Sequence, residues 1–339
     1  MSLTKVKTFQ ISKFILPIMV CMFNICLLLY PREVLSAARD GLGLWFNNVL
    51  PSLLPFMIAI NMLIGFGFVK LLGGLLSPVM AIFKLPGSSG VALITGLTSG
   101  YPMGAKTVAD LCHEKQISLR EAQHILSFCN NAGPLFIVGV VGVGLFESSS
   151  IGYLLWVAHI LAALSVGLLL RIYAKHEVKP VKNIVQKSIA SYQEYRNKHD
   201  CSLGKVLGES VKNAMESIML IGGLIILFCV IIRMLIVTGI FDSLYVLLTP
   251  IGVNKYLLDG LLAGLLEVAN GARVLGGSNP PLAYVAIASA LIAFGGFSVH
   301  AQTLHFTAGI GIKVIPYLLC KALHGILAFF WTVLLWHIR

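Results

Sequence analysis

The sequence predicts an all-α, polytopic membrane protein made of two inverted-topology repeats with interrupted, re-entrant helices. Three observations predict it. The chain is 57% hydrophobic and only 12% charged, whereas soluble domains carry about 25% charged residues. An internal match divides the chain into two similar halves. Glycine, proline and polar residues interrupt long apolar runs at corresponding places in both halves.

Composition and charge exclude several classes of protein. The net charge of +11 does not indicate a nucleic-acid partner, because seven Lys or Arg residues gather between Tyr173 and Gly208, against three acids. That clustering is typical of a cytoplasmic loop of a membrane protein. The seven cysteines lack paired C-x-x-C spacing and mostly lie in apolar runs, so neither a disulfide framework nor a metal site is expected. The lipid bilayer is the expected surrounding.

The N-terminal segment, residues 1–44, is expected to hold one transmembrane helix and a connection. Lysines precede an apolar run from Phe14 to Tyr30, and no small-residue cleavage site follows it. We therefore expect an uncleaved helix with its N-terminus inside. The run from Val49 to Val69 then returns inward.

The internal match defines the repeats. NMLIGFG at 61–67 corresponds to RMLIVTG at 233–239, and Pro78 meets Pro250 at the same spacing. At a slightly shorter spacing GAK at 104–106 faces GAR at 271–273, and NNAGPLF at 130–136 has a loose counterpart in AFGGFSV at 293–299. The predicted repeats are residues 45–173 and 208–339, joined by a basic cytoplasmic linker at 174–207.

Tracing the chain from a cytoplasmic linker gives the two halves opposite orientations. Leu85–Cys112 is predicted to form a re-entrant hairpin broken near Gly100–Pro102, while Ala214–Val237 runs outward. Full spanning of both interrupted helices stays open as an alternative. Backbone that lacks hydrogen bonds costs several kcal/mol in hydrocarbon, so such breaks survive where they line a cavity. Free N–H groups at the broken helix ends are suited to binding an anion.

The candidate substrate-binding residues lie at these breaks. Lys106 and Arg273 are equivalent cations within apolar sequence, where an unpaired charge costs about 2.5–3.5 kcal/mol. They are expected to capture an anion, or alternatively to reach the lipid headgroups. Glu267 either binds a coupling proton or cation, or pairs with Arg273. The complete set is Thr98, Ser99, Gly100, Lys106, Ser127, Asn130, Asn131, Glu267, Asn270 and Arg273.

Other polar features do not indicate chemistry. His300, Gln302 and His305 lack nearby acidic or cysteine ligands, so they are interpreted as lining a gate or an interface, and no metal is predicted. The sequence contains no HExxH, GxSxG or Walker motif. We therefore predict no enzyme, no catalytic residues and no cofactor.

Three segments carry a resemblance to a known family. TSGYPMGAKTVADL, ILSFCNNAGPLFIVGVVGVGLF and GLLEVANG resemble the sporulation integral membrane protein family YlbJ, also called SpoVV. That family carries the nucleoside-recognition Gate domain of concentrative nucleoside transporters and spore maturation proteins. The resemblance extends from about Trp45 to Phe330 and implies a Gate-type transporter fold.

The resemblance also implies a substrate and a location. It implies export of dipicolinic acid, a small aromatic dianion, from the mother cell across the outer forespore membrane during sporulation. Two alternatives stay open: a nucleoside or other metabolite transporter of the same fold, and a non-transporting membrane protein needed for spore-envelope assembly. The expected partners are a small anionic substrate and the bilayer, with no nucleic acid. A homo-oligomer stays open.

Overall fold

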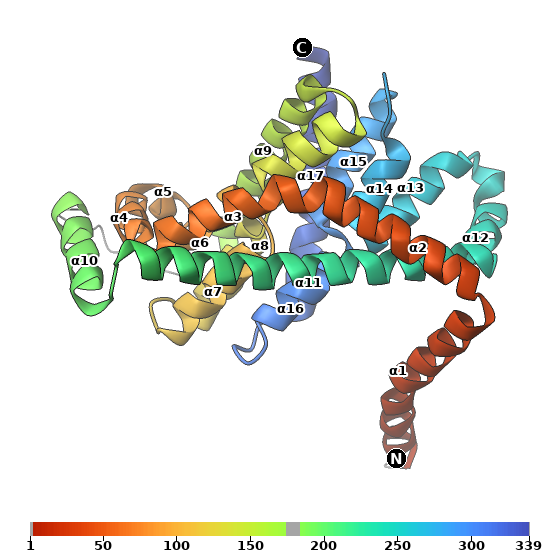
Figure 1. Cartoon of the computed structure of the whole chain (residues 1–339), viewed down its shortest axis with the longest axis horizontal. Coiled ribbons are helices and arrows are strands. Elements are labelled where there is room, and N and C mark those ends of the chain that lie inside the picture. Colours follow the sequence, from red (N-terminus) through yellow and green to blue (C-terminus); the bar gives the residue numbers. More distant parts are fainter. Residues whose placement is uncertain (1–2, 174–183, 339) are drawn as a thin grey trace.

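The computed structural model describes residues 3–173 and 184–338, and every regular element in these ranges is a helix (Figure 1). Four helices are long and apolar enough to cross a membrane, or five if the pair bent by 101° at Tyr30 counts as one span. The predicted all-α, polytopic fold is therefore confirmed. Positions 174–183 of the predicted linker lie outside the described residues.

The first half begins with α1 (Leu3–Leu29) and α2 (Pro31–Leu44), and α2 continues through a π-helical turn, η1 (Trp45–Val49), into α3 (Leu50–Gly65). Shorter helices follow, and the half ends with the long helix α9. Their bounds are α4 (Phe68–Leu75), α5 (Ser77–Ile82), α6 (Ser89–Thr98), α7 (Met103–His113), α8 (Leu119–Cys129), the π-helix η2 (Leu135–Leu145) and α9 (Ser149–Tyr173).

The second half repeats this order of elements after the linker helix α10 (Ile184–Lys198). The long helix α11 corresponds to the continuous α2–η1–α3, and the last long helix, α17, corresponds to α9. The bounds are α11 (Leu203–Val237), α12 (Ile240–Leu248), η3 (Thr249–Ile251), α13 (Lys255–Leu266), α14 (Val268–Leu275), α15 (Leu282–Phe294), α16 (Gly296–Phe306) and α17 (Val314–Ile338).

The long helices of the two halves lie antiparallel, side by side across the molecule (Figure 1). The Trp45 indole N–H donates to the carbonyl oxygen of Ile218 at 3.1 Å. At the other end of the pair, the Asn61 amide donates to the carbonyl oxygen of Ser210 at 3.3 Å. The two helices therefore run in opposite directions, as equivalent helices of inverted repeats do.

Both long helices end in the same way. Gly67 follows α3 with φ 77°, and Gly239 follows α11 with φ 76°. This left-handed conformation is nearly free of strain only for glycine, so glycine is the usual residue just beyond a helix end. The two glycines occupy matching places in the internal repeat. The local geometry of the chain therefore follows the repeat that the sequence predicts.

Each half contains a helical hairpin whose two arms pack through glycine. In the first hairpin, α6–α7, a Cβ on Gly104 would lie 3.2 Å from the Cα of Gly96. In the second, α13–α14, a Cβ on Gly271 would lie 2.3 Å from the Cα of Gly264. Such close approach means that the chain reverses direction at the break of each hairpin. The first break lies between Thr98 and Met103, and the second lies at Glu267. The predicted break near Gly100–Pro102 is thus observed as a turn that reverses the direction of the chain.

A second interrupted helix follows each hairpin. Residues 130–134 separate α8 from η2, and Gly295, with φ 100°, separates α15 from α16. Gly100 lies against the first of these breaks, because a Cβ at Gly100 would be 2.5 Å from the backbone nitrogen of Gly133. The second break packs closely against α13, because a Cβ on Gly296 would lie 2.9 Å from the carbonyl oxygen of Gly264.

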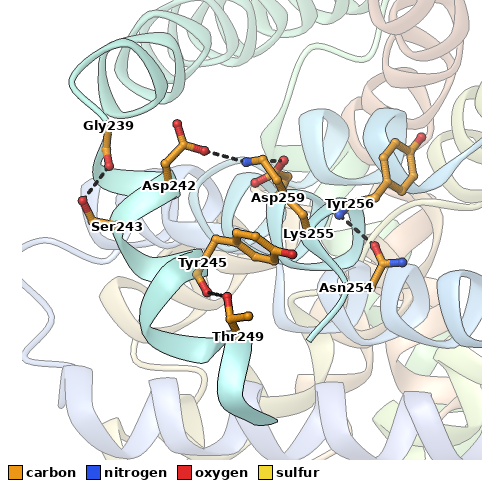
Figure 2. Close-up of polar contacts among 9 residues, drawn as sticks. All are labelled: Gly239, Asp242, Ser243, Tyr245, Thr249, Asn254, Lys255, Tyr256 and Asp259. Carbon is orange, nitrogen blue, oxygen red and sulfur yellow. Dashed lines mark hydrogen bonds and ion pairs between the residues drawn. The ribbon is translucent and has the colours of Figure 1, made fainter. Parts of the chain in front are cut away.

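The outer end of the second hairpin is fastened to α12 by a small charged cluster (Figure 2). The ammonium of Lys255, at the start of α13, lies 2.8 Å from Asp242 on α12 and 3.4 Å from Asp259 one turn along α13. The same ammonium lies 5.6 Å from the ring centroid of Tyr245. Asn254 caps α13 by accepting the N–H of Tyr256 at 2.8 Å. These contacts hold the start of α13 against α12.

Candidate functional site

The breaks of both halves meet at a central cavity of about 40 Å³. Ser99 and Tyr101 line it from the first hairpin break, and Gly133 lines it from the α8–η2 break. Glu267 lines it from the second hairpin break, and Gln302 from α16. Apolar residues of α11 and of the η1–α3 helix close its sides, among them Val49 and Ile221. The cavity therefore needs elements of both halves.

Three polar groups at this cavity have no hydrogen-bond partner among the described residues. They are the hydroxyls of Ser99 and Tyr101 and the amide oxygen of Gln302, and all three atoms are buried. A buried polar group without a partner costs about 1–3 kcal/mol. Groups of this kind, converging from two halves of a molecule, are typical of a site that completes its hydrogen bonds with water or with a ligand.

The central cavity is too small for an organic substrate in this conformation. Its volume of about 40 Å³ holds only a few water molecules, since each needs roughly 10–15 Å³ of such volume. An organic substrate can occupy this place only after the breaks move apart. The conformation described is therefore one in which the meeting point of the breaks is occluded.

Glu267 is a helix cap rather than the partner of a cation. Its carboxylate accepts the N–H groups of Ala269 at 3.1 Å and Asn270 at 2.8 Å, which satisfies the first turn of α14. It also accepts from the Asn270 side chain at 2.9 Å. The expectation that the α14 N-terminus is open to a bound anion is wrong, because this carboxylate already occupies it. Glu267 has no ion pair with Arg273 among the described contacts.

A second, larger cavity of about 480 Å³ lies between the first hairpin, the two long helices and the linker end. We call it the vestibule. Asn61 and Lys70 line it from the first half, Lys106 lines it from α7, Asn213 lines it from α11, and His199 lines it from the linker. The vestibule has the size of ordinary small-molecule sites, which measure about 300–1,000 Å³.

The charges of the vestibule leave one cation available. Lys70 is 3.6 Å from Glu114 and so is already paired. Lys106 lies one helical turn from Asp110 but has no carboxylate within ion-pair distance among the described residues. Asp110, Glu114 and Glu209 also line this cavity, so the vestibule carries more carboxylates than lysine ammonium groups. Lys106 is the cation that this arrangement offers to an anion.

The vestibule and the central cavity are neighbours separated by a thin wall. Met103 lines the vestibule, and Tyr101, two residues earlier, lines the central cavity. On α11, Asn213 lines the vestibule and Ile221 the central cavity. Between them the Ser217 hydroxyl donates to the Asn213 carbonyl at 2.9 Å and lies 3.8 Å from the sulfur of Met103. Met103 is 5% exposed, and it lies on the side of the vestibule that is nearer to Tyr101 in sequence.

The two asparagines predicted as ligands lie at the α8–η2 break and are fully buried. The Asn130 amide donates to the Thr303 hydroxyl at 2.8 Å and to the Tyr317 hydroxyl at 3.0 Å. The Asn131 amide donates to the carbonyl of Phe128 at 2.8 Å. The side-chain oxygen of each asparagine has no partner among the described residues. The side-chain nitrogens of both asparagines thus stabilise the α8–η2 break, and their side-chain oxygens can accept hydrogen bonds from water or a ligand.

The remaining predicted residues lie away from the cavities or are already engaged. Thr98 and Ser127 each donate to a carbonyl one turn back in their own helix, at 2.7 Å and 2.9 Å. Asn270 contacts Glu267 and the sulfur of Cys229. Arg273 is exposed and lines neither the central cavity nor the vestibule. The structure therefore does not bring Lys106 and Arg273 to one cavity.

Several polar residues at the centre do not belong to the predicted set. Tyr101 and Gln302 line the central cavity, although Gln302 was interpreted only as part of a gate. Lys321 on α17 is buried, and its ammonium bonds to the Asn130 carbonyl at 2.9 Å. The signal for Lys321 is present in the sequence, because a lysine inside an apolar span is costly without a role. In the described ranges no group of three or more His, Cys, Asp or Glu is placed to hold a metal ion.

Two similarities to known proteins bear on this fold and site. The Gate family model, described as nucleoside recognition, matches residues 46–130, which include the first hairpin and α8. A curated relative, the "Sporulation integral membrane protein YlbJ" of Bacillus subtilis (strain 168), is 36% identical over 349 aligned residues, covering 99% of this chain and 84% of the relative. No solved structure gives a significant match. The chain is an integral membrane protein that belongs to the YlbJ family of sporulation proteins.

Proposed function

We propose that this protein is a transporter of a small organic anion, dipicolinic acid, out of the mother cell across the outer forespore membrane. The observation that carries the proposal is the meeting of two re-entrant hairpins, from inverted halves, at an occluded polar cavity. Broken helices of two repeats facing one central point are the usual construction of a secondary transporter site. The sporulation relative supports the cellular setting.

Within the vestibule, Lys106 is the residue that supports entry of an anionic substrate from the linker side. Lys106 is the cation without an ion pair there, and the vestibule is large enough for a molecule of this class. Tyr195 and His199 of the linker line the same space. With the linker on the cytoplasmic side, an anion binds first at Lys106. It then passes Met103 and completes the hydrogen bonds of Ser99, Tyr101 and Gln302.

A nucleoside is the second candidate substrate. The Gate model described as nucleoside recognition matches the first half, and the uncharged groups Ser99, Tyr101 and Gln302 at the central cavity suit a neutral, hydrogen-bonding solute. The two candidate substrates differ in their expected interaction with the vestibule. A dianion can accept a charge-assisted hydrogen bond from the ammonium of Lys106, whereas a neutral nucleoside gains no such ionic interaction.

The test is uptake by the purified, full-length protein in proteoliposomes. Labelled dipicolinate and labelled uridine are offered separately, and the other compound is added unlabelled as a competitor. We expect saturable dipicolinate uptake that excess uridine does not reduce. Uridine uptake without dipicolinate uptake would assign the second substrate. Absence of both, with protein shown to be folded and inserted, would favour the non-transporting role in spore-envelope assembly.

A further inference from the structure

A buried cluster of ionisable residues lies on α9 and α17, and the proposed substrate path does not use it. Lys321 on α17 is 1% exposed. Its ammonium lies 2.9 Å from the carbonyl oxygen of Asn130 and 2.9 Å from Nδ1 of His324. The Nε2 atom of His324 lies 3.2 Å from the carbonyl oxygen of His159, and the two imidazole rings are 4.7 Å apart.

The charge of Lys321 has no counter-ion among the described residues. α17 packs against α8, α9 and α15, and the described contacts of Lys321 include no Asp or Glu. The ionisable groups that face it from α8, α9, α16 and its own helix are all neutral acids or weak bases. They are Cys129, His159, His300, Tyr317, Cys320 and His324.

Both protonation states of Lys321 satisfy the same two hydrogen bonds. The contact with His324 fixes its tautomer, since Nε2–H donates to the His159 carbonyl and Nδ1 accepts from Lys321. An ammonium uses two of its three N–H groups for Asn130 and His324. A neutral amine has two N–H groups and can keep both bonds. Gaining or losing a proton therefore breaks no hydrogen bond, although it changes the strength of each.

The charge on Lys321 is linked to the central cavity through the breaks. Lys321 holds the carbonyl of Asn130, and the next carbonyl, that of Asn131, accepts the N–H of Tyr101 at 2.5 Å. Tyr101 lines the central cavity, and its buried hydroxyl has no hydrogen-bond partner among the described residues. Charge-assisted hydrogen bonds are roughly twice as strong as neutral ones. The protonated lysine thus holds the α8–η2 break more firmly than the neutral amine does.

We propose that Lys321 is a proton-binding site and that the protein carries one proton with each substrate anion. The amine takes a proton from water on the side where the anion enters, because the anion in the central cavity stabilises the ammonium. When the anion leaves, the ammonium returns the proton to water on the opposite side. This proposal rests on the transport function proposed above, and it names the ion that is coupled to it.

The test uses the full-length protein in proteoliposomes that contain a pH-sensitive dye. Dipicolinate added outside at equal pH should acidify the lumen in the wild type. Lys321→Gln still donates to the Asn130 carbonyl but cannot take up a proton, so we expect no acidification and no uptake driven by a pH gradient. Exchange of labelled for unlabelled dipicolinate needs no net proton movement and should persist. Lys212→Gln is the matched control, since Lys212 is exposed on α11, and it should behave as the wild type does.

Two transport results would overturn the proposal. One is dipicolinate-driven acidification by Lys321→Gln equal to that of the wild type. The other is loss of exchange together with loss of uptake in Lys321→Gln, which would make the residue purely structural. A substrate-free measurement separates this proposal from the transport function. The pH dependence of thermal unfolding should differ between the wild type and Lys321→Gln, and parallel curves would end the proton-binding role even if dipicolinate is not the substrate.

Discussion

The backbone N–H of Tyr101 donates to the carbonyl oxygen of Asn131 at 2.5 Å. This one contact joins the break of the first hairpin to the break between α8 and η2. The same two segments touch again where Gly100 lies against Gly133. The two interruptions in the first half are therefore one structural unit, and movement of either must move the other.

The first prediction concerns Gly100. Its φ of 79° is in the left-handed region, and a Cβ there would lie 2.5 Å from the Gly133 nitrogen. We expect Gly100→Ala to lower the free energy of unfolding by about 1–3 kcal/mol and to reduce transport strongly. Gly139→Ala is the control, because no atom lies within 4 Å of its added Cβ. Thermal unfolding in detergent checks both, and equal midpoints for the two variants would contradict the close approach.

The second prediction separates the cations. Lys106 lines the vestibule without an ion pair, Lys70 is paired with Glu114, and Arg273 is exposed outside both cavities. We expect Lys106→Ala to reduce dipicolinate uptake much more than Arg273→Ala does, with both variants inserted at the normal level. The paired-cation hypothesis from the sequence predicts that each substitution strongly lowers uptake. Initial uptake rates per inserted protein decide between them.

The third prediction concerns Glu267. If its main role is to cap α14, Glu267→Ala should lower stability by roughly 0.5–2 kcal/mol, the usual cost of a lost N-cap. Glu267→Gln keeps one acceptor oxygen and should retain most of the transport. Thermal unfolding and uptake are measured on both variants. Full stability with abolished transport in Glu267→Gln would instead assign a coupling role to the carboxylate.

The fourth prediction concerns the side of the linker. Asn197 and Asn279 are both exposed, the first in the linker helix and the second in the loop after α14. In a cysteine-free background expressed in the cell membrane of non-sporulating cells, a membrane-impermeant thiol reagent should label Asn279→Cys in intact cells. It should label Asn197→Cys only after permeabilisation. Labelling of Asn197→Cys in intact cells would show that the vestibule opens on the outer side.

The positions of the breaks were predictable, and their partners were not. Glycine and proline at 100 and 102 stand out in apolar sequence, since they interrupt a helix where lipid offers no hydrogen bonds. The internal repeat, traced from a cytoplasmic linker, likewise indicated halves of opposite orientation. The sequence does not show that the Asn131 carbonyl meets Tyr101, nor that Gln302 reaches the same cavity as Ser99. Such meetings depend on how separate helices pack in three dimensions.

The roles of charged residues were the least predictable part. Glu267 and Arg273 are two helical turns apart in sequence, and pairing was a reasonable alternative, yet the carboxylate caps the turn that follows it. Lys321 did have a detectable signal, a lysine within the apolar helix α17. Its importance emerges only from its contact with Asn130, which is distant in sequence.

The most direct test of the central claim removes polar groups from the central cavity without changing its charge. Ser99→Ala combined with Gln302→Leu replaces two unpartnered polar groups by apolar side chains that are no larger. Counterflow of labelled dipicolinate is measured in proteoliposomes for this variant and the wild type. The account predicts saturable counterflow by the wild type and its loss in the double variant, with both proteins monodisperse and equally stable. Equal counterflow by the two proteins would show that the meeting point of the breaks is not the transport site.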